Sequence, residues 1–340
     1  MGDAENIEDF ISLPPHHRCV SHTLNLIAVK DTETALENDL QYKKIYRTTF
    51  AKLTKLWNKQ NQSTQVADRI KEACDVYLKT PVITRWNSTF DSVCQLVSLL
   101  KTKSDKINQC FDFCNLQRLT DNEIKFLEDY CQVMEPLARA LDILQSDLGM
   151  YMGYLLPVLN TLQQKEQSFI ENELNCHSLI NAILSGLDKR FSVMFERKDL
   201  LIASCLHPKF KLNWLTGERR KYAESCLQQL FGIQSKDNSP DMKDTTDEHD
   251  DFFEFHRQSN ESIEEELQRF LRSKKSNIEM LHEYPKIKKL FIKYNTALPS
   301  SASVERLFSV GGTVLKPQRS HLNDDSMEHQ LLLKINKSFW

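Results

Sequence analysis

A thiol and an imidazole stand three residues apart near the amino terminus, at Cys19 and His22, which is the spacing of half a structural zinc site. His16 and His17 lie close by in the sequence. A structural zinc ion needs four ligands, and no matching CxxC or HxxxH pair follows at the usual spacing. We therefore expect no bound metal at this cluster.

An arginine and a tryptophan are adjacent in the stretch Thr-Arg-Trp-Asn-Ser-Thr, at Arg85 and Trp86. The guanidinium of such a pair can hold a phosphate, and the indole can stack on a base. The alternative is a core tryptophan that begins a helix, because tryptophan is highly buried on average. Both interpretations stay open, and the residue types favour the core position.

One acid stands inside a small and apolar run near the carboxyl terminus, where Ser-Ala-Ser-Val-Glu-Arg-Leu-Phe-Ser places Glu305 before Arg306. A carboxylate in such a run can bind a catalytic metal ion, begin a helix or belong to an interface. The rest of the chain has to decide among the three.

The last residues of the chain form an apolar stripe at helical spacing. Leu332 and Trp340 lie beside four residues at steps of four, namely Met327, Leu331, Ile335 and Phe339. Large aromatic side chains are enriched at the centres of interfaces. The stripe either packs back onto its own domain or contacts a partner chain.

The composition is that of an ordinary globular protein. The 340 residues are 40% hydrophobic and 27% charged, which is enough for a sizeable core. The net charge of −3 argues against tight DNA binding by the chain as a whole and leaves room for a local basic patch.

Cysteine and hydropathy patterns place the chain in a reducing, intracellular compartment. It has nine cysteines and no secretory signal peptide. No run approaches the roughly 18 unbroken apolar residues of a membrane span, so we expect no membrane partner.

Glycine scarcity and hydrophobic period predict a mainly α fold. The chain has eight glycines, none of them between Gly2 and Gly149, although hairpins and phosphate-binding loops need this residue. Apolar residues recur at helical spacing almost throughout residues 21–235. Further helices are predicted at 150–168, 177–197, 218–231, 259–274 and 282–296.

Three local signals qualify this pattern. Thr120 and Glu123 form a capping-box pattern, and Pro136 should kink or divide the helix that follows. Residues 80–84 read Thr-Pro-Val-Ile-Thr and are β-branched apart from the proline, so an extended strand and a plain loop fit equally well. Residues 234–258 are acidic, polar and without period, as in a mobile linker.

Taken in order, the motifs resemble those of the hAT superfamily of DNA transposases and the host proteins derived from them. The matching elements are Cys-x-x-His-x-Leu-Asn-Leu from Cys19, Thr-Arg-Trp-Asn-Ser-Thr from Thr84 and Ser-Ala-x-x-Glu-Arg-x-Phe-Ser from Ser301. A fourth, Leu-His-Pro-Lys-Phe-Lys from Leu206, is similar to the family's Leu-Asp-Pro-Arg-Phe-Lys, with His207 in place of the acid. The resemblance covers nearly the whole chain.

The resemblance implies a ribonuclease H-like catalytic domain, interrupted by a long helical insertion and closed by a C-terminal dimerisation region. This chain would hold only a remnant of the catalytic core. The implied divisions are residues 1–30 for the end of the catalytic core, 31–233 for the helical insertion, 234–258 for the acidic linker and 259–340 for the hAT dimerisation region. The resemblance also implies a nuclear location.

By the same resemblance, Glu305 stands where the family keeps the third acid of its metal-binding Asp-Asp-Glu triad. The family's two aspartates precede the Cys-x-x-His element, but only 18 residues precede Cys19, and neither Asp3 nor Asp9 lies in a matching motif. One acid cannot hold the two metal ions of strand transfer. We therefore expect no intact catalytic site and no cofactor, since Mg²⁺ or Mn²⁺ would need the full triad.

The expected function is that of a truncated or domesticated transposase-like protein that acts by self-association, as a homodimer or higher oligomer. The alternative is a fragment of an active or DNA-binding transposase whose missing amino-terminal part supplies a BED-type zinc finger and two aspartates. Weak DNA contact would use Arg85, Trp86 and His22. The residues expected at the dimerisation surface are Leu307, Phe308, Leu331, Leu332, Ile335, Phe339 and Trp340.

Overall fold

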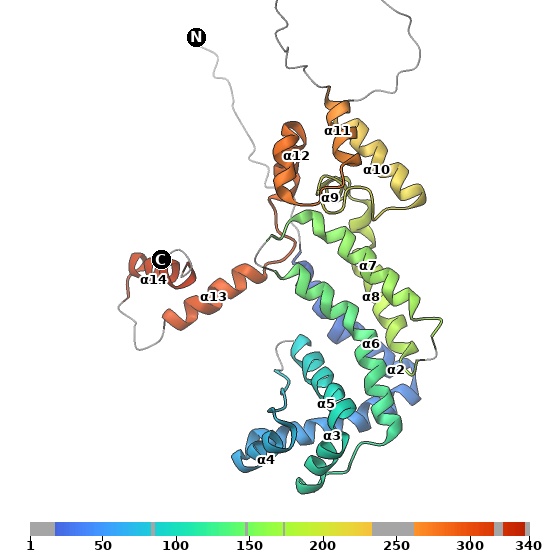
Figure 1. Ribbon diagram of the computed structural model, residues 1–340, viewed down its shortest axis with the longest axis vertical. Coiled ribbons are helices and arrows are strands. Elements are labelled where there is room, and N and C mark those ends of the chain that lie inside the picture. The colour runs from blue at the N-terminus through green and yellow to red at the C-terminus, as the bar shows by residue number, and fades with distance from the viewer. Residues whose placement is uncertain are drawn as a thin grey trace, which may run out of the picture.

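The computed structural model describes residues 18–82, 86–146, 149–172, 174–232, 262–315 and 322–336, and only the backbone of Trp86. Throughout these ranges the chain forms helices and loops without a β-strand (Figure 1). The prediction of a mainly α-helical fold is confirmed for this part of the chain. The predicted linker at 234–258 lies outside the described residues.

The helices follow one another with mostly short connections. In chain order they are α1 (Val20–Leu26), η1 (Ile27–Asp31), α2 (Glu33–Asn38), α3 (Leu40–Gln62), α4 (Thr64–Cys74), α5 (Trp86–Phe113), α6 (Asp121–Leu144), η2 (Met152–Tyr154), α7 (Leu155–Ser168), α8 (His177–Glu196), α9 (Lys198–Cys205), α10 (Gly217–Leu230), α11 (Ile263–Arg272), η3 (Ile278–Glu283), α12 (Pro285–Asn295), α13 (Ala302–Val314) and α14 (Asp324–Ile335). Helix α5 is interrupted at Lys103, whose backbone is not helical.

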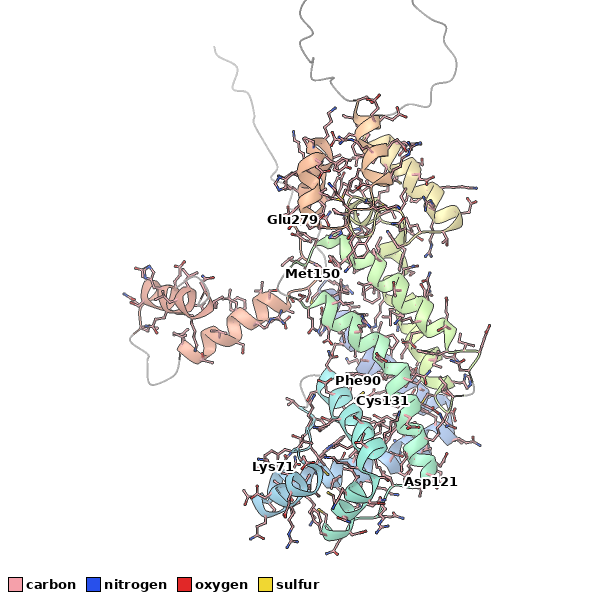
Figure 2. The ribbon with its side chains drawn as sticks, in the orientation of Figure 1. Lys71, Phe90, Asp121, Cys131, Met150 and Glu279 are labelled. Carbon is pink, nitrogen blue, oxygen red and sulfur yellow. The ribbon has the colours of Figure 1, made fainter. Side chains whose placement is uncertain are left out.

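Most of the helices build an elongated body (Figure 1). At one end α4 packs between α3 and α5, and at the other end α9 packs against α10 and α12. Helices α6, α7 and α8 connect the two ends, each packed against the next. Phe90 on α5 and Cys131 on α6 lie at the junction of those two helices (Figure 2).

A single cluster of buried apolar side chains runs through the body from α1 to α12. It includes fully buried residues from helices far apart in the sequence, such as Leu24, Phe126 and Phe270. In the part of the chain that the structure describes, no helix is long and apolar enough to cross a membrane.

Helix α6 shows how the local signals act. The Thr120 hydroxyl accepts the Glu123 N–H, and the Glu123 carboxylate accepts the Thr120 N–H at 2.8 Å, so the predicted capping box forms. Pro136 does not divide the helix. An internal proline costs about 3 kcal/mol, and burial of apolar residues on both sides of it, such as Val133 and Leu137, offsets this at about 1.5–3 kcal/mol per side chain.

The segment between α4 and α5 has neither helix nor strand as far as Val82, and residues 83–85 lie outside the described ranges. The Gln60 side chain holds it in place. Its Nε2 donates to the Leu78 carbonyl at 2.8 Å, and the Leu78 N–H donates to Oε1 at 2.9 Å. These two bonds satisfy backbone groups that would otherwise need a partner strand. Of the two predictions for 80–84, the loop fits the part described.

Helices α13 and α14 form an arm that points away from the body (Figure 1). Helix α13 leaves the body, and α14 packs against its outer part. Within α13 only Gly311 and Val314 are buried, and no described residue of α14 is fully buried. We call α13 and α14 together the C-terminal hairpin.

Candidate functional site

Two of the sequence motifs meet where the C-terminal hairpin joins the body. Cys19 caps α1, and its sulfur accepts the His22 N–H at 3.5 Å. The Ser301 N–H donates to the same sulfur at 3.4 Å, and the Val20 N–H donates to the Pro299 carbonyl at 3.0 Å. The Cys-x-x-His element and the Ser-Ala-x-x-Glu-Arg element therefore form one junction.

The electrostatics of Cys19 follow from this junction. Burial raises the pKa of the thiol, but hydrogen bonds with Ser301, His22 and Ser300 outweigh it and leave the pKa below its ordinary value. Donors from α1 and from the start of α13 converge on this sulfur, which therefore links the two helices. Among the described residues, no group of three or more His, Cys, Asp or Glu side chains could hold a metal ion. His16 and His17 lie outside those residues.

Glu305 and Arg306 make different contacts at the start of α13. The Ser301 hydroxyl donates to the Glu305 carboxylate at 2.7 Å, and the Glu305 N–H donates to the Ser301 carbonyl at 2.9 Å. The acid thus lies in the first turn of α13, where it interacts favourably with the helix dipole. Arg306 donates to the Gln145 carbonyl, at the end of α6, at 2.5 Å. Sequence reasoning missed Gln145, because a backbone acceptor has no sequence signature.

Of the three residues predicted to contact nucleic acid, the structure places one. His22 is exposed on α1. Arg85 and the side chain of Trp86 lie outside the described residues, so the choice between a base contact and a core tryptophan stays a prediction.

The inner half of α13 exposes an apolar face. Val304 is 48% exposed, Leu307 37% and Phe308 73%. At 100° per residue these three lie on the same side of the helix as Gly311. Gly311 is covered by the Met327 methyl group of α14. Helix α14 therefore covers the outer part of this face and leaves the inner part open.

Helix α14 adds apolar side chains of its own. Met327 and Leu331 are half-buried, while Leu332, Leu333 and Ile335 are exposed. The Lys334 ammonium donates to the Thr313 hydroxyl at 2.6 Å and ties the two helices together. The predicted stripe is thus only partly covered, since Leu331 is half-buried within the hairpin and Ile335, one turn further on, is exposed. Phe339 and Trp340 lie outside the described residues.

The Leu-His-Pro-Lys-Phe-Lys motif lies inside the body and joins its helices. His207 is buried among aromatic rings, with Tyr154 and Phe210 about 5 Å from it, centre to centre. Burial, with a smaller contribution from Lys209, lowers its pKa to about 4. The Lys211 ammonium donates to the Ser273 and Lys275 carbonyls after α11. This motif therefore joins the segment after α9 to the segment after α11 inside the body.

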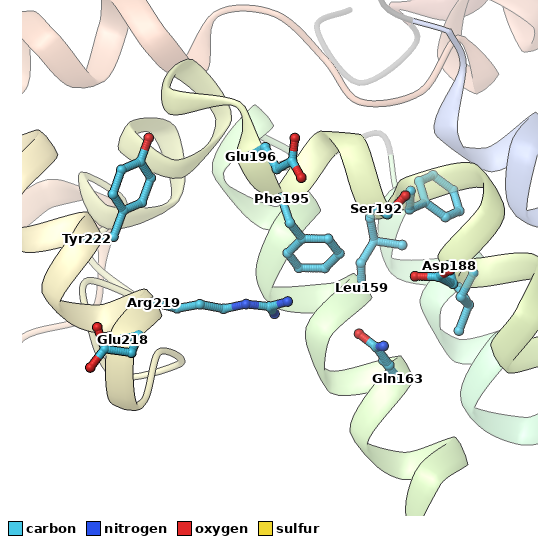
Figure 3. Close-up of a pocket in the computed structure, with 11 residues that line it drawn as sticks. Leu159, Gln163, Asp188, Ser192, Phe195, Glu196, Glu218, Arg219 and Tyr222 are labelled. Atoms are coloured by element: carbon cyan, nitrogen blue, oxygen red, sulfur yellow. The ribbon is translucent and has the colours of Figure 1, made fainter.

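A surface cavity of about 470 Å³ lies between α7, α8 and α10 (Figure 3). Arg219 reaches over the Phe195 ring, with 5.1 Å between the guanidinium carbon and the ring centre. Asp188, Glu196 and Glu218 also line it. None of the residues predicted for a site lies in this cavity.

Comparison with known proteins yields one distant similarity. No protein-family model matches the chain. The chain is 17% identical over 221 residues to the human "Zinc finger BED domain-containing protein 4". The aligned segment covers 63% of this chain and 18% of that protein. The chain thus spans less than a fifth of the length of this relative. The similarity is to a protein with a BED zinc finger, the class of protein to which the resemblance of the motifs points.

Proposed function

We propose that this chain is a transposase-derived interaction module that self-associates through the C-terminal hairpin. The uncovered apolar face of that hairpin carries the proposal. Of the 18 large hydrophobic side chains that are exposed in the described residues, six belong to it, namely Val304, Leu307, Phe308, Leu332, Leu333 and Ile335. Exposed hydrophobic residues scattered singly are ordinary, but Val304, Leu307 and Phe308 lie on one side of α13, and such a group is typical of an interaction site.

The junction with the body explains why this face stays open. Arg306 donates a hydrogen bond to the end of α6, and the Ser301 N–H donates one to Cys19 at the start of α1. These contacts hold α13 by its first turns, and the rest of the helix extends away from the body (Figure 1). A second copy offers the same apolar face, and two such faces can pair about a twofold axis, which is the commonest symmetry of soluble oligomers. Phe308 would lie near the centre, where aromatic side chains contribute most.

The proposal also holds that this chain alone does not carry out strand transfer. Glu305 is engaged with Ser301 as a helix-start residue, and a two-metal reaction needs several carboxylates around the ions. The alternative is that the chain is part of a longer DNA-binding transposase. The human relative has a BED zinc finger by name, and DNA association and a nuclear location are part of this alternative.

Sedimentation of the full chain tests self-association. We expect a dimer for the parent and a folded monomer for Phe308→Asp combined with Leu332→Asp, because each substitution buries a charge at the interface. Val193→Asp with Ile292→Asp is the matched control, since these side chains on the body are 69% and 54% exposed. The control should remain dimeric. A monomeric parent, or a dimer that survives the hairpin substitutions, would rule the proposal out.

A further inference from the structure

Helix α3 carries positive charge without any acid. Among its 23 residues there are six basic side chains and no Asp or Glu, and the six are Lys43, Lys44, Arg47, Lys52, Lys55 and Lys59. The chain as a whole has 44 basic and 47 acidic residues. Helix α3 is therefore a strong local departure from the average charge of the protein.

Almost none of this charge is neutralised by the fold. Lys52 pairs with Glu123 at 2.7 Å and is largely buried. Within the part of the chain that the structure describes, the other five basic residues of α3 form no ion pair. Exposed lysines elsewhere do, for example Lys221 with Glu218 and Lys275 with Glu283.

The exposed cations lie on one side of the helix. Lys44, Arg47, Lys55 and Lys59 are exposed, whereas Leu53 and other residues of the opposite side are buried in the body. At 100° per residue the four lie within about 60° of one line along α3, and the line is about 22 Å long. We call these four residues the basic stripe. Helix α3 crosses the end of the body opposite α12, so it is remote from the acidic first turn of α11 (Figure 1).

The residues between the cations favour a phosphate backbone over unpaired bases. The exposed positions along the stripe are small or polar, namely Thr48, Ala51, Thr54 and Asn58. Single-stranded nucleic acid is bound by stacking on exposed aromatic rings, but the aromatic residues of α3 face inwards. Tyr46 and Phe50 stack on each other, with ring centres 4.3 Å apart.

We propose that the basic stripe of α3 binds the phosphate backbone of double-stranded DNA without reading its bases. Lys44 and Lys55 lie along the centre of the stripe, with Arg47 on one flank and Lys59 on the other. These flanks suit the phosphate rows on either side of the B-form major groove, which is about 12 Å wide and admits a helix. The major groove of A-form RNA is too narrow for this contact.

Salt-dependent binding of the full chain to a short labelled DNA duplex tests the proposal. Each phosphate contact gives a slope of about −0.9 in log K against log salt, so four contacts predict about −3.6. The triple variant with Lys44→Gln, Lys55→Gln and Lys59→Gln keeps one phosphate contact, that of Arg47. Its slope should therefore fall in magnitude to about −0.9. At about 0.1 M salt the affinity should fall roughly eightfold per lost contact, or more than 100-fold in total.

The matched control removes three exposed lysines from other surfaces. Lys101→Gln, Lys221→Gln, Lys275→Gln changes the net charge by the same amount, and each of these lysines is paired with an acid. The control should bind DNA like the parent, and both triple variants should keep the parent's thermal unfolding midpoint. The Phe308→Asp, Leu332→Asp variant leaves α3 intact and should keep the parent's slope per chain, so this test is independent of self-association.

Several outcomes would overturn the proposal. One is a parent that does not bind the duplex at about 50 mM salt. Another is an equal loss in both triple variants, which would indicate diffuse attraction and no defined stripe. A third is tighter binding to an RNA duplex or a single strand. A fourth is equally tight binding to polyglutamate, which would assign the stripe to an acidic protein partner.

Discussion

The Ser301 amide donates a hydrogen bond to the Cys19 sulfur at 3.4 Å, across 282 residues of sequence. The bond fixes the first turn of α13 to the cap of α1. Together with the hydrogen bond from Arg306 to the Gln145 carbonyl, it sets where the C-terminal hairpin leaves the body.

Cys19→Ala should loosen this anchor. It removes the acceptor for the His22 and Ser301 N–H groups, and we expect a loss of about 1 kcal/mol in the free energy of unfolding. Amide hydrogen exchange should accelerate in the first turns of α13. Cys19→Ser keeps an acceptor and should lie closer to the parent. Unchanged exchange in Cys19→Ala would mean that Arg306 holds α13 by itself.

Gly153→Ala should destabilise the body. The Gly153 N–H donates to Asn295 Oδ1 at 2.7 Å, and the Asn295 amide donates to the Ala203 carbonyl at 3.1 Å. An added Cβ would lie 2.6 Å from the Ala203 carbonyl oxygen, which is backbone and cannot turn aside. We expect a cost of about 1–3 kcal/mol in urea unfolding.

Gly312→Ala is the control for that change. A Cβ at Gly312 meets nothing within 4 Å, and the residue is exposed in α13. Alanine is favoured over glycine in a helix by up to about 1 kcal/mol. The control should be neutral or stabilising, and equal losses in the two variants would contradict the packing around Asn295.

Glu166→Gln should remove a pH dependence of stability. Glu166 is fully buried on α7, neither carboxylate oxygen has a hydrogen-bond partner, and burial raises its pKa to about 8. The folded state therefore holds the proton more tightly than the unfolded state, in which the pKa is near its ordinary value of 4.5. The stability is fully present below about pH 4.5 and is lost as the pH rises to about 8, at a slope of up to about 1.4 kcal/mol per pH unit.

The measurement is urea unfolding at several pH values between these limits. The difference between Glu166→Gln and the parent should grow with pH and then level off. Glu171→Gln changes an exposed acid nearby in the sequence and should follow the parent. A constant difference between Glu166→Gln and the parent would show that Glu166 does not change its charge in this range.

With Mg²⁺ or Mn²⁺ and hairpin or nicked DNA, we expect no cleavage by the chain alone. Glu305→Gln should then change only the start of α13, at a cost of about 0.3–1 kcal/mol for the lost interaction with the helix dipole. The assay is gel analysis of labelled DNA. Metal-dependent cleavage that disappears in Glu305→Gln would mean that the chain does assemble a catalytic site.

Much of the helical fold could be predicted from local patterns. The capping box of Thr120 and Glu123 marks the start of α6, and the predicted helix at 177–197 corresponds to α8, His177–Glu196. Such signals lie within a few turns of sequence and act before any tertiary contact. Whether Pro136 divides α6 could not be predicted in this way, because the free-energy cost of a proline inside the helix is offset by burial of its neighbours against other helices.

The candidate sites were predicted less completely. The apolar residues of the hairpin could be recognised, although Val304 and Leu333 were not among those expected. The basic stripe was missed even though its signal is in the sequence, as a helix of 23 residues without an acid. The net charge of the whole chain concealed it, since charge averaged over 340 residues says nothing about one face of one helix.

Local sequence patterns are enough to predict that the chain is helical, where most helices lie and which of their sides are apolar, because these properties depend on residues three or four positions apart. What covers each apolar side depends on contacts between helices that are distant in the sequence. A periodic stripe is the same whether the helix packs on its own core or on a partner. The contacts of Cys19 and Arg306 with Ser301 and Gln145 direct α13 away from the body and leave Phe308 exposed.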